Sequence, residues 1–396
     1  MDDEIEAELS EGYIKGYCGS SHCDLTRALP PLSAPSRLSS WVPSWCPTSM
    51  SLLKNTEAKI LACIRNDLVS RFVSLPSQDK IWTLTLNPNQ NQAASSKTSI
   101  SATHTSIHSM GRTPLVLVHG FGGGVGLWVH NLDTLSQRRT VHAFDLLGFG
   151  RSSRPAFSND PGQAEEQSVH AIEEWRRAMG LDSVILLGHS LGGYLAASYA
   201  LAHPQRVRHL ILVDPWGFPE HPSTRPQTGE PSGGEVKPSG PPRWVKGVAS
   251  VLMHFNPLAV IRAAGPWGPG LVQRFRPDFK RKFEDLFEDN TMTDYIYHCN
   301  AQTPSGEIAF RAMSESFGWA KRPMLPRMPL LSQDTPMTVL YGAQSWVDSS
   351  TGERIKTLRP GSYVKNIIIE GASHHVYADQ PDEFNRVVQE ICDSID

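Results

Sequence analysis

The sequence lacks most of the features that mark a membrane-spanning, metal-binding or nucleic-acid-binding protein. In its 396 residues no apolar run approaches the roughly 18–20 residues of a membrane span, so we expect any membrane contact to be peripheral. The six cysteines form no Cys-x-x-Cys pair and no zinc-ligand pattern, which favours reduced thiols in an intracellular protein. The acidic start of the chain has no apolar stretch, which argues against a signal peptide. A formal net charge of −3 provides no general attraction to nucleic acid.

What is present is the composition of a soluble globular protein, with 39% hydrophobic and 19% charged residues. The core pattern stops after Asp214 and resumes near residue 336, which indicates an insertion. The predicted units are a weakly ordered tail at 1–40, a segment with tryptophans and an amphipathic helix at 41–70, a first core part at 71–214, an inserted lid at 215–335 and a second core part at 336–396. In the predicted helix, Leu53 and Ile60 share the apolar face, and Glu57 falls elsewhere.

The core pattern is an alternation of apolar strands with helices. Two runs at 71–75 and 80–86 predict a β-hairpin, and six later runs predict strands separated by helices. These six lie at 114–118, 140–144, 183–187, 207–213, 337–341 and 364–370. Such alternation builds a mostly parallel, doubly wound sheet that helices cover on both faces, so the predicted fold class is α/β.

Ser190 lies between a predicted strand and a predicted helix, in the sequence Gly-His-Ser-Leu-Gly. Gly188 and Gly192 leave room for a sharp turn that holds the serine hydroxyl clear of the backbone at the start of a helix. A G-x-S-x-G pattern occurs by chance in long proteins, but the flanking strand and helix favour a nucleophile.

Candidates for a base and an acid follow later strands. A serine becomes a strong nucleophile only when a base takes its proton and an acid orients that base. His374 follows the last predicted strand, and the Gly-Ala-Ser turn before it favours it over the adjacent His375 as the base. Asp348, a short loop beyond the fifth of the six strands, is the favoured acid. Asp214, directly after the fourth, is the alternative.

A glycine-rich loop at 119–124 directly follows the strand at 114–118. We expect the backbone N–H groups of Phe121 and Leu191 to stabilise the oxyanion that develops during acyl transfer. A loop of this kind can instead cradle phosphate, but its pattern is not G-x-G-x-x-G and no Walker lysine follows.

The inserted lid combines basic and apolar residues. Between 243 and 330 there are twelve Lys or Arg and eight Asp or Glu, and 276–282 is the densest basic stretch. Aromatic residues are interleaved, among them Trp244, Phe255, Trp267, Phe275, Phe283 and Phe287. This combination suits an anionic amphiphile such as a phospholipid at an interface, and the alternative is a solvated basic helix face.

Two further patterns each have an ordinary structural alternative. Trp41 and Trp45, which prolines flank, are candidates for an interfacial membrane anchor, or they pack on the protein's own surface. His374 and Asp379 have the spacing of the glycerolipid-acyltransferase pattern His-x4-Asp, or Asp379 simply caps the final helix.

Five segments from across the chain carry a resemblance to a known family, namely residues 119–124, 144–155, 188–193, 271–282 and 295–300. Together they resemble the α/β-hydrolase domain-containing subfamily of proteins four and five, from about Trp41 to Asp396. The resemblance implies an α/β-hydrolase fold with an inserted helical lid. It implies a serine lipase that removes acyl chains from N-acyl-phosphatidylethanolamine and lysophospholipids, because this chain has Ser190 where a co-activator in the subfamily has asparagine.

The resemblance also implies the cofactor requirement, substrate, location and partners of such an enzyme. We expect no metal or organic cofactor, a phospholipid or lysophospholipid substrate, and a cytoplasmic location with peripheral association to intracellular membranes or lipid droplets. Lipases or droplet-coat proteins are the expected protein partners, and nucleic acid is not expected. Two alternatives stay open, a lipid-droplet lipase co-activator and a lysophosphatidate acyltransferase that uses His374 and Asp379.

Overall fold

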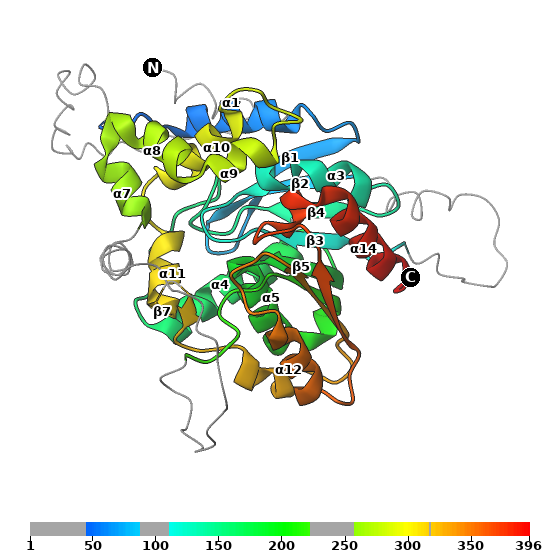
Figure 1. Ribbon diagram of the computed structural model, residues 1–396. Coiled ribbons are helices and arrows are strands. Elements are labelled where there is room, and N and C mark those ends of the chain that lie inside the picture. Colours follow the sequence, from blue (N-terminus) through cyan, green and yellow to red (C-terminus); the bar gives the residue numbers. More distant parts are fainter. Residues whose placement is uncertain (1–44, 88–110, 222–256, 317) are drawn as a thin grey trace, which may run out of the picture. The chain divides into compact units, whose positions relative to one another are not determined.

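The structure is a computed structural model, and the residues that it describes are 45–87, 111–221, 257–316 and 318–396. Within them, an eight-stranded sheet has the strand order β1-β2-β4-β3-β5-β6-β9-β10 (Figure 1). Its strands are β1 (Leu68–Ser74), β2 (Lys80–Leu86), β3 (Leu115–Val118), β4 (Val141–Phe144), β5 (Val184–His189), β6 (Val207–Val213), β9 (Met337–Gly342) and β10 (Val364–Ile369).

The pairing of these strands brings six loops to one edge of the sheet. The predicted hairpin is confirmed, because β1 and β2 pair in antiparallel fashion from Leu68 opposite Leu86 to Ser74 opposite Lys80. β2 is also antiparallel to β4, and the other neighbours are parallel. Parallel strands end at the same edge, so the loops that follow β3, β4, β5, β6, β9 and β10 meet there.

Helices cover both faces of the sheet (Figure 1). On one face lie α4 (Pro161–Ala178), α5 (Leu191–Ala202) and α12 (Ser350–Leu358), and on the other lie α1 (Met50–Leu61), η2 (Val125–Trp128), α3 (Val129–Leu135), α13 (Val376–Asp379) and α14 (Pro381–Asp393). The short turn η3 (Pro204–Arg206) leads into β6. The predicted α/β class with a doubly wound, mostly parallel sheet is therefore confirmed.

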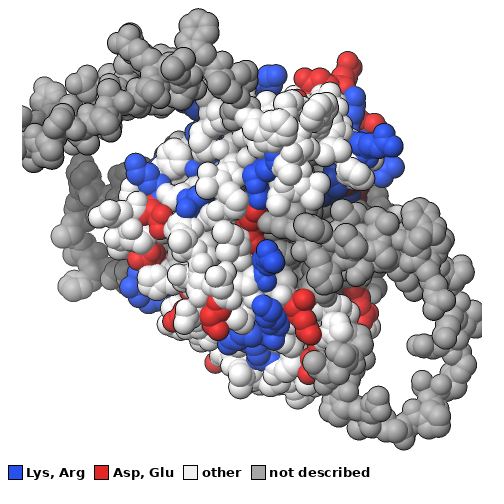
Figure 2. Space-filling view, turned by 90° about the vertical axis from the view of Figure 1, so that its left-hand side faces the viewer, with Lys and Arg blue, Asp and Glu red and all other residues white. Residues whose placement is uncertain are grey.

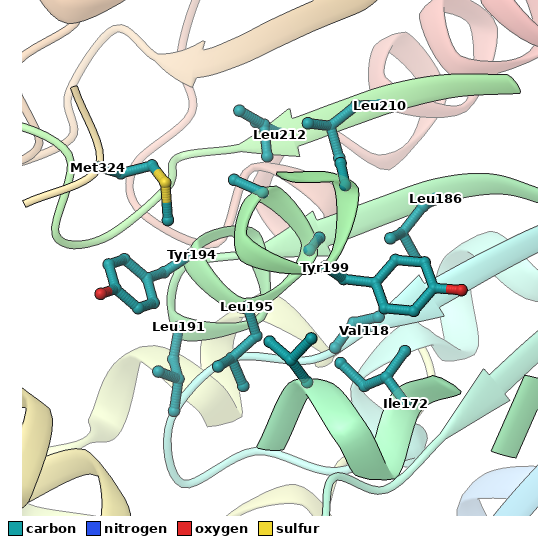
Figure 3. Close-up of a cluster of buried hydrophobic side chains, with 14 of the residues drawn as sticks. Val118, Ile172, Leu186, Leu191, Tyr194, Leu195, Tyr199, Leu210, Leu212 and Met324 are labelled. Atoms are coloured by element: carbon teal, nitrogen blue, oxygen red, sulfur yellow. The ribbon is translucent and has the colours of Figure 1, made fainter. Parts of the chain in front are cut away.

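The two faces of the sheet contribute to two separate hydrophobic cores. Leu186 of β5 belongs to the first core, and its neighbour Leu187 belongs to the second, because successive side chains of a strand point to opposite faces. Figure 3 shows part of the first core, where side chains of α5 lie between β5 and β6 on one side and Ile172 of α4 on the other. Burial on both faces explains why these strands are continuously apolar.

Between β6 and β9, which lie side by side in the sheet, the chain forms a separate group of elements that we call the insert. Its described elements are α7 (Pro257–Ala263), η5 (Gly265–Trp267), α8 (Gly268–Phe275), α9 (Pro277–Lys282), α10 (Thr291–Asn300), α11 (Gly306–Met313), β7 (Ser314–Ser316), β8 (Trp319–Ala320) and η6 (Leu325–Leu330). α10 packs against both α1 and α8, which joins the insert to the start of the described chain. The unit boundaries predicted from the sequence stay predictions.

Glu57 of α1 corrects one sequence-based expectation. The helical pattern placed this residue outside the apolar face, but its side chain is buried. Trp82 Nε1 and Arg151 Nη1 donate to its carboxylate over 2.8 and 2.9 Å. Burial raises the pKa of Glu57 to about 8.

Candidate active site

Ser190 occupies a sharp turn between β5 and α5, as the sequence predicts. Its backbone has φ 53° and ψ −117°, a conformation that is strained for any residue with a side chain. A Cβ atom on Gly188 would lie 2.3 Å from the carbonyl oxygen of Gly192. A Cβ atom on Gly192 would lie 2.5 Å from the carbonyl oxygen of Val118. Both glycines are therefore required for the turn that presents the serine hydroxyl.

His374, in the loop after β10, contacts both Ser190 and a buried acid. Its Nε2 atom lies 3.0 Å from Ser190 Oγ, and its Nδ1 atom lies 2.5 Å from Asp214 Oδ2. Because a carboxylate accepts, Nδ1 donates to Asp214 and Nε2 is left to accept the serine hydroxyl. This is the arrangement of a nucleophile, a base and an orienting acid. The half-buried ring of His375 lies beside Phe279 and does not take this position.

The prediction that Asp348 orients His374 is wrong, and the alternative Asp214 takes that position. Asp348 is exposed, and its carboxylate accepts from the backbone N–H and the hydroxyl of Ser350 over 3.0 and 2.8 Å. Asp214 directly follows β6, which is the neighbour of β5 in the sheet. The end of the neighbouring strand brings its carboxylate close to the nucleophile, whereas the loop after β9 carries Asp348 away to the start of α12.

Burial controls the charge of this group of residues. Burial, with a smaller contribution from the nearby cations Arg276 and Lys282, lowers the pKa of His374 to about 4. Burial raises the pKa of Asp214 to about 7, against hydrogen bonds from Ser345 and from the backbone N–H of Gly342. At neutral pH the imidazole is therefore uncharged, which is the state that accepts a proton from Ser190.

Two positioning contacts were not predicted from the sequence. His189, the residue before the nucleophile, donates from Nε2 to the backbone carbonyl of His374 over 2.9 Å. The hydroxyl of Ser345 donates to the Asp214 carboxylate. His189 could have been singled out, because it is part of the Gly-His-Ser-Leu-Gly motif. No sequence pattern indicates that Ser345 and Asp214 contact each other.

Asp379 of the His-x4-Asp pattern contacts the histidine loop and the insert, and no hydrogen bond joins it to the His374 ring. Its Oδ2 atom accepts from the backbone N–H and the hydroxyl of Ser373 over 2.9 and 2.6 Å. Its Oδ1 atom pairs with Lys282 of α9, whose Nζ also donates to the Ser373 hydroxyl over 2.9 Å. Asp379 thus ties α9 to the residue that precedes His374.

The glycine-rich loop lies against the nucleophile. A Cβ atom on Gly120 would lie 3.0 Å from Ser190 Cβ. His119 fixes this loop, because it donates from Nδ1 to the carbonyl of Gly120 and accepts from the backbone N–H of Leu146, over 2.8 and 3.0 Å. Phe121 follows directly and lines the same pocket as Ser190. The role of the Phe121 and Leu191 N–H groups as oxyanion donors stays a prediction.

A pocket of about 420 Å³ opens above the nucleophile. Its floor contains Ser190 and His374, and its walls are mostly apolar side chains of the insert. The apolar wall residues from the insert are Leu258, Val260, Ile261, Leu271, Val272, Phe275, Phe279, Ile296 and Phe310. The volume is in the range of small-molecule sites, and the lining favours a long apolar ligand.

Comparisons with known proteins agree with this geometry. Residues 113–250 match the family model of the α/β-hydrolase fold. The chain is 62% identical over 359 residues to the human "(Lyso)-N-acylphosphatidylethanolamine lipase", which covers 91% of this chain and 96% of that protein. It is 52% identical over 349 residues to human "1-acylglycerol-3-phosphate O-acyltransferase ABHD5", covering 88% and 92% respectively. The chain belongs to this α/β-hydrolase subfamily.

Solved structures of other α/β-hydrolases share the fold at low sequence identity. A bacterial membrane phospholipase A aligns with a TM-score of 0.55 and 21% identity, covering 87% of this chain and 91% of that one. Naproxen esterase from Bacillus subtilis aligns with a TM-score of 0.56 and 16% identity, covering 86% and 97%. These likenesses support the fold of this α/β-hydrolase, whereas the subfamily rests on the sequence relatives.

Proposed function

We propose that this protein is a serine lipase that releases fatty acids from N-acyl-phosphatidylethanolamine and from its lyso form. The observation that carries the proposal is the hydrogen-bonded series Ser190–His374–Asp214 on the floor of an apolar pocket. Relatives that are 61–62% identical over 91% of the chain carry the name (lyso)-N-acylphosphatidylethanolamine lipase, which supports the substrate class.

The mechanism follows from the positions of the three side chains. His374 Nε2 takes the proton of Ser190 as its Oγ attacks the ester carbonyl, and Asp214 stabilises the imidazolium that forms. The backbone N–H groups of Phe121 and Leu191 stabilise the oxyanion. His374 then gives its proton to the departing glycerol oxygen, and a water molecule hydrolyses the acyl-serine ester by the same steps.

Mass spectrometry of the products tests this proposal. The purified protein should convert N-acyl-lysophosphatidylethanolamine to a free fatty acid and glycerophospho-N-acylethanolamine. Ser190→Ala should lower kcat by at least about 10³-fold. Ser350→Ala is the matched control, because this exposed serine donates its hydroxyl to Asp348 and lies outside the Ser190–His374–Asp214 series. A wild-type protein that releases no fatty acid, or a Ser190→Ala variant that releases it as fast, would overturn the proposal.

We also propose peripheral association with a lipid surface through aromatic residues beside the pocket. Trp45, Trp267 and Phe275 are 60%, 71% and 70% exposed, and Phe275 also lines the pocket. The Trp45 ring lies 6.4 Å from the Trp267 ring, and its Nε1 donates to the carbonyl of Ala263 over 3.1 Å. Trp41, the other predicted anchor residue, lies outside the described residues.

The surroundings of these aromatic residues suit a membrane interface. In Figure 2 the side of the molecule where α7 and α8 lie faces the reader, and uncharged residues cover much of the described surface between scattered groups of Lys, Arg, Asp and Glu. In the described part of the chain no helix is long and apolar enough to cross a bilayer. Exposed tryptophans near basic side chains favour binding at the membrane interface.

Flotation with phosphatidylcholine vesicles tests the association. Trp45→Ala combined with Trp267→Ala should lower the vesicle-bound fraction, because both exposed rings are removed. Leu330→Ala is the control, since this residue of η6 is exposed but lies outside the aromatic group. Equal binding of the double variant and the wild type would contradict this part of the proposal.

Acyl transfer to 1-acylglycerol-3-phosphate is a second candidate function, and the name of the 52% identical relatives supports it. The acyl-Ser190 ester would then react with a lipid hydroxyl in place of water. The contacts of Asp379 with Lys282 and Ser373 favour a structural role for this residue in either reaction. Incubation with acyl-CoA and lysophosphatidate tests the candidate, and the absence of a diacyl product would exclude it.

A further inference from the structure

The described lining of the pocket above Ser190 carries positive charge but no negative charge. Among the described residues that line it, Arg276 is the one Lys or Arg, and the lining contains no Asp or Glu. Lys282, a nearby cation outside the lining, has a buried side chain and is paired with Asp379. Arg276 also pairs with an acid, Asp278, but it belongs to the lining and keeps guanidinium donors that Asp278 does not use, so it is the group in the pocket wall best suited to bind an anion.

Ring contacts connect Arg276 to the histidine pair. The guanidinium carbon of Arg276 lies 4.3 Å from the centre of the Phe279 ring. The Phe279 ring lies 5.0 Å from the ring of His375, which is adjacent to His374. Arg276 thus lies near the reacting groups, on the part of the wall that the start of α9 forms.

The hydrogen bonds of Arg276 hold it in place without using all of its donors. Its Nε and Nη2 atoms donate to the two oxygens of Asp278, each over 3.0 Å. Its Nη1 atom has no hydrogen-bond partner in the described parts of the chain, and the side chain is 42% exposed. The planar guanidinium is thus oriented by Asp278 and Phe279 with donors to spare. That geometry matches the oxygens of a phosphate group.

We propose that Arg276 binds the phosphodiester of the lipid substrate while the acyl chain occupies the apolar pocket. This inference rests on the proposed lipase function and adds the residue that distinguishes a phospholipid from an uncharged glyceride. The phosphate of a lysophospholipid is joined to the same glycerol as the ester, so one molecule can reach Ser190 and Arg276 together.

The test compares two substrates with the same acyl chain in the same detergent micelles. One is N-acyl-lysophosphatidylethanolamine, and the other is the uncharged monoacylglycerol. Arg276→Gln should lower the ratio of kcat/KM between them by about ten- to a hundred-fold, as expected for the loss of hydrogen bonds from a charged donor. Arg276→Lys should lose less, because it keeps the charge but not the planar pair of donors. Arg274→Gln, an exposed residue of α8 outside the pocket lining, should leave the ratio unchanged.

Further measurements distinguish a failure of the proposed role of Arg276 from a failure of the lipase proposal. Equal labelling of all variants with a fluorophosphonate probe shows that the nucleophile is intact, so that a changed ratio reports recognition. An unchanged ratio in Arg276→Gln, or an equal loss on both substrates, would overturn the role of Arg276 while the lipase proposal stands. A wild type that hydrolyses neither lipid would instead overturn the lipase proposal and this inference with it.

A last experiment distinguishes a site for the phosphate of a lipid headgroup from a site for free phosphate. Inorganic phosphate added to the monoacylglycerol reaction should leave the rate of the wild type unchanged. Inhibition of the wild type but not of Arg276→Gln would assign the site to a free anion and would overturn its assignment to the lipid headgroup.

Discussion

The substitution Asp214→Asn tests most sharply whether Asp214 is the acid that orients His374. Asp214 Oδ2 lies 2.5 Å from His374 Nδ1 and accepts a hydrogen bond from its N–H. The amide of an asparagine would instead donate towards Nδ1, so the imidazole would carry its proton on Nε2. In that tautomer His374 could not accept the proton of Ser190, although the shape of the site would be kept.

The expected loss is large and falls on kcat. The equivalent change in a serine-protease triad lowers kcat by about 10⁴-fold. At about 1.36 kcal/mol for each factor of ten, this corresponds to about 5 kcal/mol of transition-state stabilisation. The assay is the steady-state hydrolysis of the lysophospholipid at saturating concentration, with KM measured separately.

Asp348→Asn provides the matched control for this prediction. Asp348 is exposed, and its carboxylate accepts hydrogen bonds from the backbone N–H and the hydroxyl of Ser350. The side-chain oxygen of an asparagine also accepts such hydrogen bonds. The kcat of Asp348→Asn should equal that of the wild type. A large loss in Asp348→Asn with normal activity in Asp214→Asn would refute the assignment of Asp214 as the orienting acid.

Three further predictions concern protonation, the insert and the turn. His374 acts as a base only when neutral, and it becomes charged as the pH falls through its lowered pKa. In a plot of kcat/KM against pH, the activity should therefore fall on the acid side with a midpoint below 6.5 and towards 4. A midpoint at 6.5 would contradict the argument that burial lowers this pKa. Asp379→Asn leaves the buried Lys282 without its partner, so urea denaturation should show a loss of about 3–5 kcal/mol, most of which Lys282→Met should recover in the double variant. Gly192→Ala forces a Cβ against the backbone of β3 and should cost about 1–3 kcal/mol or more, whereas Gly270→Ala, whose Cβ meets nothing within 4 Å, should leave the melting temperature equal or higher.

The sheet and the nucleophile turn could be predicted because local patterns determine them. Each central strand is a short apolar run between helices, and the observed strands β3, β4, β5, β6, β9 and β10 fall on the predicted runs. Ser190 and its two glycines form a motif whose geometry depends on neighbours in the chain. His374 could also be predicted, because a strand and a small turn place it.

The acid could not be predicted because its choice depends on which strands are neighbours in space. Asp214 and Asp348 both follow strands that end at the same edge of the sheet. Only the structure shows that the end of β6 meets His374, and that the β9 loop supplies the hydroxyl of Ser345 instead. The left-handed backbone of Asp214, with φ 46°, is the local sign of a special position, and the sequence does not reveal it.

The burial of Glu57 and the partner of Asp379 escaped prediction for a similar reason. A helical pattern treats a carboxylate as solvent-facing, but in the interior Trp82 and Arg151 donate to one oxygen of Glu57. Asp379 meets Lys282 across nearly a hundred residues of chain, so the His-x4-Asp spacing says nothing about this ion pair.

The central claim is that Ser190 is the nucleophile of an ester hydrolase, and covalent labelling tests it most directly. The purified protein is treated with a fluorophosphonate, lysophospholipid hydrolysis is measured, and the modified peptide is identified by mass spectrometry. We expect one adduct on Ser190, a loss of activity in proportion to labelling, and no adduct in Ser190→Ala. Full hydrolysis by protein that is completely labelled at Ser190, or equal labelling of Ser190→Ala, would contradict the account.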